Sequence, residues 1–219
     1  VWNRSHIMKK ILFLAFLQLL FPARGFSQND PAALAVLDRF SSRALGAPSV
    51  SMEFNLRTEN LADRTSSSRK GSVILAGDKY KLDLEDNIIW FNGTTSWNLL
   101  PAEKEVTITT PGKNDDSFLG KPSQIFSLYR KGYKSRLLEE KADSYLIDLY
   151  PEELNSDHVR IRLKIGKPAL DLRNLEYKYK NGTTITLDVT SFDLKKNPSS
   201  TTFIFEPEKY RGVEIIDMR

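Results

Sequence analysis

The stretch from 71 to 110, GSVILAGDKYKLDLEDNIIWFNGTTSWNLLPAEKEVTITT, constrains the fold more than any other part of the chain. Pairs of turn-forming residues separate its short apolar runs: Gly77-Asp78, Asp86-Asn87 and Asn92-Gly93. Asn-Gly between two apolar runs predicts a hairpin, because both residues tolerate the positive φ of a type I′ turn. We therefore expect about five short strands here, forming a curved antiparallel sheet with one strongly apolar face.

A single amphipathic helix is predicted before the sheet. Asp30 is a typical N-cap residue, and Pro31 suits the first helical position. Apolar residues then recur at spacings of three and four as far as Ala44, and Gly46 follows as a stop signal. The helix is expected to be either a packed cap or a movable lid.

Alternation of apolar and polar residues predicts strands over much of the remaining chain. The expected strands lie at 49–57, 133–141, 144–150, 158–165, 169–180, 183–194 and 201–205. The serine-rich segment 59–69 is expected to be a mobile hairpin loop, and 111–121 a second loop. The apolar segment 124–132 predicts a short helix that either packs in the core or closes an apolar cavity. About eleven strands with two or three helices in antiparallel order favour a barrel or a strongly curved sheet.

The first 27 residues are interpreted as an upstream extension followed by a cleaved signal peptide. Lys9 and Lys10 precede an apolar run from Ile11 to Phe21, which is too short to span a bilayer. A retained N-terminal anchor is the alternative. The remainder, 28–219, is expected to be one domain. Segment 1–27 holds four of the 32 Lys and Arg residues and no acid, so the rest is near neutral and nucleic-acid binding is not expected.

The residues offer little for catalysis or for a cofactor. The chain has no cysteine, and residues 28–219 contain one histidine, His158, which we interpret as a surface or edge residue. A zinc site of the usual type needs more Cys or His ligands than this. The chain has no phosphate-binding loop, dinucleotide fingerprint or G-x-S-x-G motif. We therefore expect no enzyme activity, no metal and no cofactor.

The chain has more large apolar side chains than one thin sheet covered by two short helices can bury. Some of them must form an ordinary core, and the others are candidates to line a ligand cavity. The candidates to line such a cavity are Phe54, Leu56, Val73, Leu75, Tyr80, Leu82, Ile89, Phe91, Trp97, Leu99, Ile125, Phe126 and Tyr129.

Four segments in order resemble the periplasmic outer-membrane lipoprotein carrier family, the LolA type. They are GSVIL with KYKLD, FNGTTSWNLLP with EVTI, PSQIFSLY, and the C-terminal FIFEPEKYRGVEIID. The resemblance covers the chain from about Asp30 to its end. It implies an incomplete antiparallel barrel with a helical lid over a hydrophobic cavity. It also implies a monomeric carrier that receives acylated lipoproteins from an inner-membrane ABC transporter and passes them to an outer-membrane acceptor.

The chain departs from the family pattern at the first hairpin. Gly77-Asp78 stands where the family has an Arg-Pro pair, whose arginine ties the lid to the barrel, so that tie is not carried over. The principal alternative is a lipid-binding module of the same fold for a polyisoprenoid or a glycolipid. A regulator that binds a partner protein would need an extra domain, for which the length leaves little room.

Overall fold

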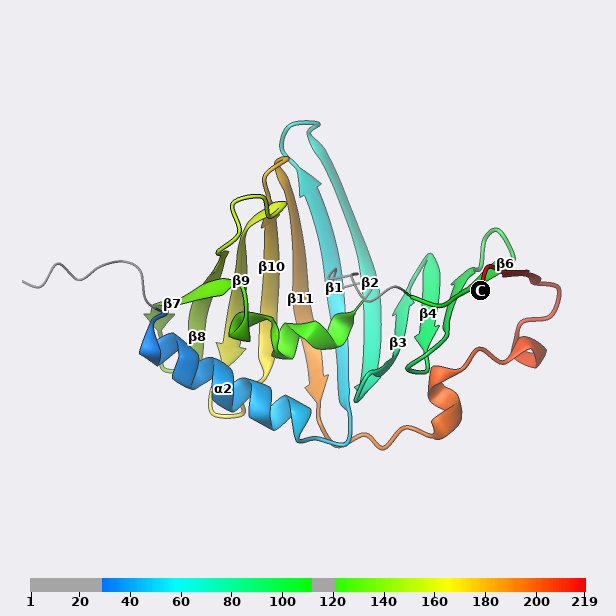
Figure 1. The fold of residues 1–219 in the computed structure, drawn as a ribbon, viewed down its shortest axis with the longest axis horizontal. Coiled ribbons are helices and arrows are strands. Elements are labelled where there is room, and N and C mark those ends of the chain that lie inside the picture. The colour runs from blue at the N-terminus through cyan, green and yellow to red at the C-terminus, as the bar shows by residue number, and fades with distance from the viewer. Residues whose placement is uncertain (1–28, 112–120) are drawn as a thin grey trace, which may run out of the picture.

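Twelve strands in the described part of the chain form one open sheet (Figure 1). The computed structural model describes residues 29–111 and 121–219, so the predicted signal peptide and most of the predicted loop 111–121 lie outside it. The strands are β1 (Val50–Asn60), β2 (Thr65–Ala76), β3 (Lys79–Leu84), β4 (Asn87–Phe91), β5 (Ser96–Leu100), β6 (Glu105–Thr109), β7 (Tyr133–Glu140), β8 (Ser144–Pro151), β9 (His158–Gly166), β10 (Leu172–Tyr179), β11 (Thr183–Asp193) and β12 (Glu214–Asp217). Their order is β12-β6-β5-β4-β3-β2-β1-β11-β10-β9-β8-β7.

The predicted incomplete antiparallel barrel is confirmed, with one addition. Neighbouring strands pair antiparallel except for β12, which runs parallel to β6. This strand lies beyond residue 205, where no further strand was predicted. Residues 194–213 connect β11 to β12 and bring the end of the chain beside β6, at the edge of the sheet opposite β7.

One α-helix and two short 3₁₀ turns cover one face of the sheet, which we call the inner face (Figure 1). They are α2 (Pro31–Leu45), η2 (Pro122–Phe126) and η3 (Leu128–Arg130). The helix begins as predicted, since Asp30 Oδ1 accepts a 2.9 Å hydrogen bond from the Ala32 amide. The helix predicted at 124–132 is present as the two 3₁₀ turns. Among the described residues, no helix has both the length and the apolar character to cross a membrane.

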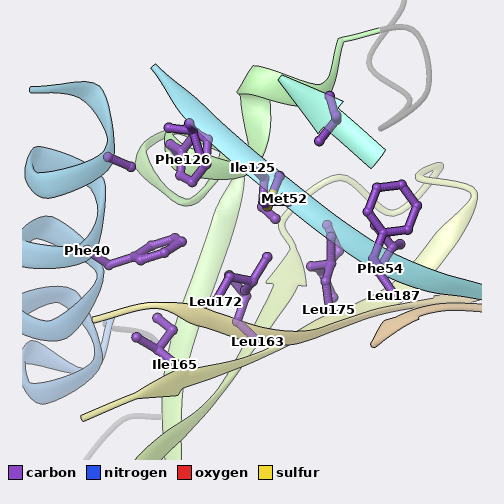
Figure 2. Packing of buried hydrophobic residues seen from close by; sticks show 14 of the residues in the cluster. Phe40, Met52, Phe54, Ile125, Phe126, Leu163, Ile165, Leu172, Leu175 and Leu187 are labelled. Carbon is purple, nitrogen blue, oxygen red and sulfur yellow. The ribbon is translucent and has the colours of Figure 1, made fainter. Parts of the chain in front are cut away.

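The inner face carries the main hydrophobic core (Figure 2). In the register of the sheet, Met52 lies opposite Val73, and Val73 opposite Leu82. Leu187 and Leu175 continue the same face on the other side of β1. Because side chains alternate between the two faces of a strand, this register lines up one apolar layer from β3 to β8.

Gly71 provides close packing in that layer. A Cβ at this position would lie 2.5 Å from the Phe54 ring and 2.7 Å from Leu84 Cδ2. The missing side chain therefore lets the ring of Phe54 lie directly against the backbone of β2.

A second, smaller core lies on the opposite, outer face of β4–β6. It contains Trp90, Leu99, Val106 and Phe205. The C-terminal segment supplies Phe205, whose ring centroid lies 5.6 Å from that of Trp90. This segment holds two further 3₁₀ turns, η4 (Ser200–Phe203) and η5 (Pro207–Lys209).

Two local predictions are wrong. The predicted hairpin loop at 59–69 is only the turn at 61–64, because β1 and β2 pair as far as Asn60 and Thr65. Most side chains of this part of β2 are exposed, so backbone pairing rather than burial stabilises the strand. Its polar composition is typical of a loop and therefore led to the wrong prediction. The predicted strand at 201–205 begins instead as η4, where the Ser199 hydroxyl lies 3.0 and 3.1 Å from those of Thr201 and Thr202. Such local hydroxyl bonds compete with extended structure.

Candidate functional site

The lid, which we define as α2 together with η2 and η3, packs on the inner face through large apolar side chains. Phe40 of α2 and Phe126 of η2 are each 1% exposed, and their ring centroids lie 5.4 Å apart. Figure 2 shows the side chains of Phe40 and Phe126 directed into the space between the lid and the strands. The lid therefore closes over the apolar layer and contributes to it.

Eleven of the thirteen candidate residues lie together in this layer. Nine belong to the buried core cluster: Phe54, Leu56, Val73, Leu75, Tyr80, Leu82, Ile125, Phe126 and Tyr129. Ile89 and Phe91 are partly buried and pack against it. The nine are packed rather than lining an open space, since even Tyr80 is only 4% exposed. The structure is thus the closed form of this face.

Trp97 and Leu99 do not share that face, contrary to the prediction. Trp97 lies opposite Trp90 in the sheet, and both belong to the outer-face core. The inner position beside Ile89 is occupied by Asn98. The alternation along β5 contains this signal, because Asn98 separates the two apolar residues. Counting large apolar side chains without assigning each to a face produced the error.

Polar contacts join the two parts of the lid to each other. The Tyr129 hydroxyl donates to Asp38 Oδ1 over 2.6 Å. Arg130 donates from Nε to the Tyr129 hydroxyl and from Nη2 to the Ser41 hydroxyl, each over 3.2 Å. We call these four residues the lid clamp. Asp38 and Ser41 belong to α2, so the clamp ties the helix to η3.

A second set of contacts ties the start of α2 to the sheet edge. Asp30 Oδ2 accepts a 3.0 Å bond from the Leu137 amide of β7. Asn29 Oδ1 accepts a 2.8 Å bond from the Ser135 amide. These bonds occupy amide groups that an edge strand would otherwise expose.

The position of the family's Arg-Pro pair is a simple turn in this chain. Gly77 has a φ of 59° and connects β2 to β3 together with Asp78. Among the described residues, the polar ties of the lid include the lid clamp, the start of α2 and a 3.4 Å hydrogen bond from Arg39 of α2 to the Tyr145 hydroxyl of β8.

The inner face ends in a group of polar aromatic residues that we call the Tyr–His cluster: Tyr133, His158, Tyr177 and Tyr179. His158 stacks on Tyr133 with the ring centroids 5.6 Å apart, and its Nε2 lies 2.7 Å from the Tyr133 hydroxyl. It meets Tyr177 and Tyr179 edge-on at 6.3 and 6.2 Å. Tyr177 belongs to the inner-face core, and Tyr133 and Tyr179 pack against it.

This cluster was not predicted from the sequence, which suggested a surface or edge position for His158. The imidazole is half-buried, and burial lowers the pKa of His158; Asp157 raises this pKa to a smaller extent, and Lys180 lowers it further. Burial also raises the pKa of Tyr179. Tyr177 and Tyr179 stand two residues apart on a strand and so share a face, which was the available signal.

Two surface pockets lie outside the inner face. One of about 270 Å³ is bordered by Lys81, Trp90 and the C-terminal segment, and one of about 540 Å³ by Glu53, Lys70 and Asp83. In the first, Lys209 is paired with Glu206 at 2.9 Å. Within residues 29–111 and 121–219, no group of three or more Cys, His, Asp or Glu side chains could hold a metal ion.

Comparison with known proteins gives a family. The family model for the outer membrane lipoprotein carrier protein LolA matches residues 24–163. No curated protein matches the chain.

Among solved structures, a conserved protein of Thermus thermophilus superposes with a TM-score of 0.52 at 11% identity, covering 85% of this chain and 99% of that one. A LolA superfamily protein of Nitrosomonas europaea gives a TM-score of 0.41 at 13% identity, with 79% and 97% covered. The Mycobacterium tuberculosis lipoprotein LppX gives 0.44 at 14% identity, with 78% and 100% covered. The first of these likenesses supports the fold, and the match to the family model shows that the chain belongs to the family of the outer membrane lipoprotein carrier protein LolA.

Proposed function

We propose that this protein is a periplasmic carrier that binds the acyl chains of lipoproteins between the lid and the inner face. It would shuttle them from the inner to the outer membrane. The proposal rests mainly on one observation: a single apolar layer lies between the lid and the open sheet. Membership of the LolA family supports the same role.

The free energy of moving an acyl chain through water requires such an apolar layer. Burying one methylene group contributes roughly 0.8 kcal/mol, so an acyl chain crosses water only when it is shielded along most of its length. In the closed form the lid side chains, chiefly Phe40 and Phe126, occupy the apolar space themselves. Acyl chains would replace these contacts when the lid opens, so that apolar surface stays covered in both states.

This exchange also accounts for release. A carrier that closes on itself keeps a stable empty state, and the cargo leaves when the lid returns or when an acceptor binds it more tightly. We propose that an inner-membrane lipoprotein-releasing ABC transporter loads the protein and that an outer-membrane acceptor unloads it. A monomer suffices for this cycle, which requires no catalytic step.

A second candidate is a periplasmic lipid-binding module of the same fold for a polyisoprenoid or a glycolipid. The Tyr–His cluster favours it, because aromatic rings with hydroxyl groups are suited to a sugar head. The two candidates share the acyl site under the lid and differ in the cargo.

The test is native mass spectrometry of the protein purified from its own periplasm, together with lipid extraction. Co-purified acylated lipoprotein supports the carrier, whereas one class of free lipid supports the second candidate. An empty protein that also fails to bind a fluorescent fatty-acid probe would contradict both. Because the chain has no cysteine, a thiol introduced at the buried position of Ile125 gives a clean measure of lid opening by maleimide labelling.

A further inference from the structure

The Tyr–His cluster adjoins the lid at the point where the lid joins the sheet. Tyr133 begins β7, three residues after η3 ends at Arg130. Gly132 between them has a φ of 81°, and its carbonyl accepts a 2.9 Å bond from the Glu152 amide. Chains lying under the lid would therefore have one end close to the cluster.

The cluster is polar but offers no cation of its own. Its members are three phenols and one imidazole, and burial keeps the imidazole uncharged near neutral pH. Of the neighbouring charges, Lys180 donates from Nζ to the Leu154 carbonyl over 2.5 Å, and Asp157 is acidic. The two charges that act on His158, those of Lys180 and Asp157, are of opposite sign and give a phosphate group no net positive partner, and burying an anion without a partner is costly.

The same groups suit an uncharged head. Phenol hydroxyls donate and accept hydrogen bonds, and a neutral imidazole does both through its two nitrogens. The rings present apolar faces with polar edges, which matches the mixed surface of a glyceryl ester or a sugar. Tyr133, His158 and Tyr179 are each partly exposed, so a ligand can reach them.

We infer that the Tyr–His cluster is the subsite for the uncharged, ester- or hydroxyl-bearing head of the lipid whose chains lie under the lid. This inference rests on the proposed acyl site. It assigns a position and a chemical class to the head, with glyceryl and glycosyl heads as the two sources of that chemistry.

The test compares ligands that share one chain. Dissociation constants are measured for dodecanol, monolauroylglycerol, dodecyl glucoside and lauroyl lysophosphatidic acid, by displacement of a fluorescent fatty-acid probe. We expect the glyceryl or the glycosyl ligand to bind about tenfold more tightly than dodecanol, the effect of one or two net hydrogen bonds. The preferred one of the two identifies the source of the head.

Variants locate the effect. His158→Phe and Tyr179→Phe keep the rings and remove polar atoms, so both should reduce the preference to less than about threefold and leave dodecanol binding unchanged. The matched control is Tyr150→Phe on the outer face, where the hydroxyl donates to Asp148 over 3.0 Å, and it should leave every constant unchanged.

The outcomes separate the two proposals. Dodecanol binding without any preference for a head overturns the inference and leaves the acyl site standing. Tightest binding of lysophosphatidic acid also overturns it, because the head would then be anionic. A preference that survives both cluster variants overturns the assigned position. Failure of all four ligands to bind overturns the acyl site and the inference together.

Discussion

The Tyr129 hydroxyl donates a 2.6 Å hydrogen bond to Asp38 Oδ1 and so joins η3 to α2 across the lid. Tyr129→Phe removes this bond and the acceptor of Arg130 Nε. We expect the free energy of unfolding to fall by about 1 kcal/mol, the usual net effect of one hydrogen bond. Amide exchange in α2 should accelerate about fivefold, and the fluorescent fatty-acid probe should bind faster. Hydrogen-exchange mass spectrometry and stopped-flow fluorescence measure these effects.

The control for the lid clamp is again Tyr150→Phe, which removes a tyrosine hydroxyl bond from the outer face. It should lower stability by a similar amount without accelerating exchange in α2. Equal acceleration in both variants would mean that exchange reports overall unfolding, and the clamp would then have no particular hold on the lid.

Asp30 uses its two carboxylate oxygens for different purposes. Oδ1 caps α2 through the Ala32 amide, and Oδ2 binds the Leu137 amide of β7. Asp30→Ala removes both, and we expect a loss of about 2 kcal/mol, of which the cap contributes about half. Urea denaturation measures this loss.

Asp30→Asn separates the two functions. An amide side chain keeps one oxygen for the cap but presents an NH₂ group to the Leu137 amide, so the loss should be about 1 kcal/mol. Both variants leave the Leu137 amide of the edge strand β7 without its side-chain acceptor and should increase self-association in light scattering. If the asparagine variant is as stable as the original protein, the bond to β7 has no energetic importance.

The stability of the protein should depend on pH through His158. Burial lowers the pKa of this imidazole in the folded state, so the unfolded chain takes up a proton more readily than the native one. The stabilisation is therefore complete above the unfolded pKa and is lost as the pH falls through the folded one. Between about pH 7.5 and about pH 5, thermal unfolding of the original protein should shift down more than that of His158→Phe. Parallel curves for the two proteins would contradict this assignment.

Local signals in the sequence predicted local structure well. The cap at Asp30 and the proline at position 31 placed the helix start where the structure has it. Such signals are reliable because each of these residues determines the backbone conformation or hydrogen bonding of its immediate neighbours. The hairpin predicted at Asn92-Gly93 also forms, but only Gly93 of this pair has a positive φ, 99°, so its turn is not the expected type I′.

Non-local pairing was harder to predict. The strand β12 pairs with β6, more than a hundred residues away, and its four residues carry no hairpin signal. The Tyr–His cluster combines residues from β7, β9 and β10, which only the register brings together. The candidate residues on β1 to β4 share the inner face, whereas Trp97 and Leu99 on β5 lie on the outer face, because that strand reverses which face is apolar.

Leu82 and Leu99 provide a direct test of that difference between the two faces. The same side chain is buried on each, with Leu82 0% and Leu99 1% exposed. Leu82 belongs to the inner-face core, which includes the lid side chains, and Leu99 belongs to the outer-face core with Phe205. Leucine to alanine at either position should cost about 2 to 5 kcal/mol, because the transfer energy is lost and a cavity remains.

Affinity for an acyl ligand should separate the two variants. The cavity in Leu82→Ala opens within the apolar layer that the ligand would occupy, and apolar cavities bind apolar ligands. In Leu82→Ala the ligand-free closed form also loses packing contacts, and a bound ligand would restore them. We therefore expect the fatty-acid probe to bind about fivefold more tightly, a gain of about 1 kcal/mol in binding free energy. Leu99→Ala should leave the affinity unchanged, provided that circular dichroism shows both variants to be folded. If probe affinity changes equally in both variants, the change reflects their common loss of stability. The ligand would then not bind under the lid.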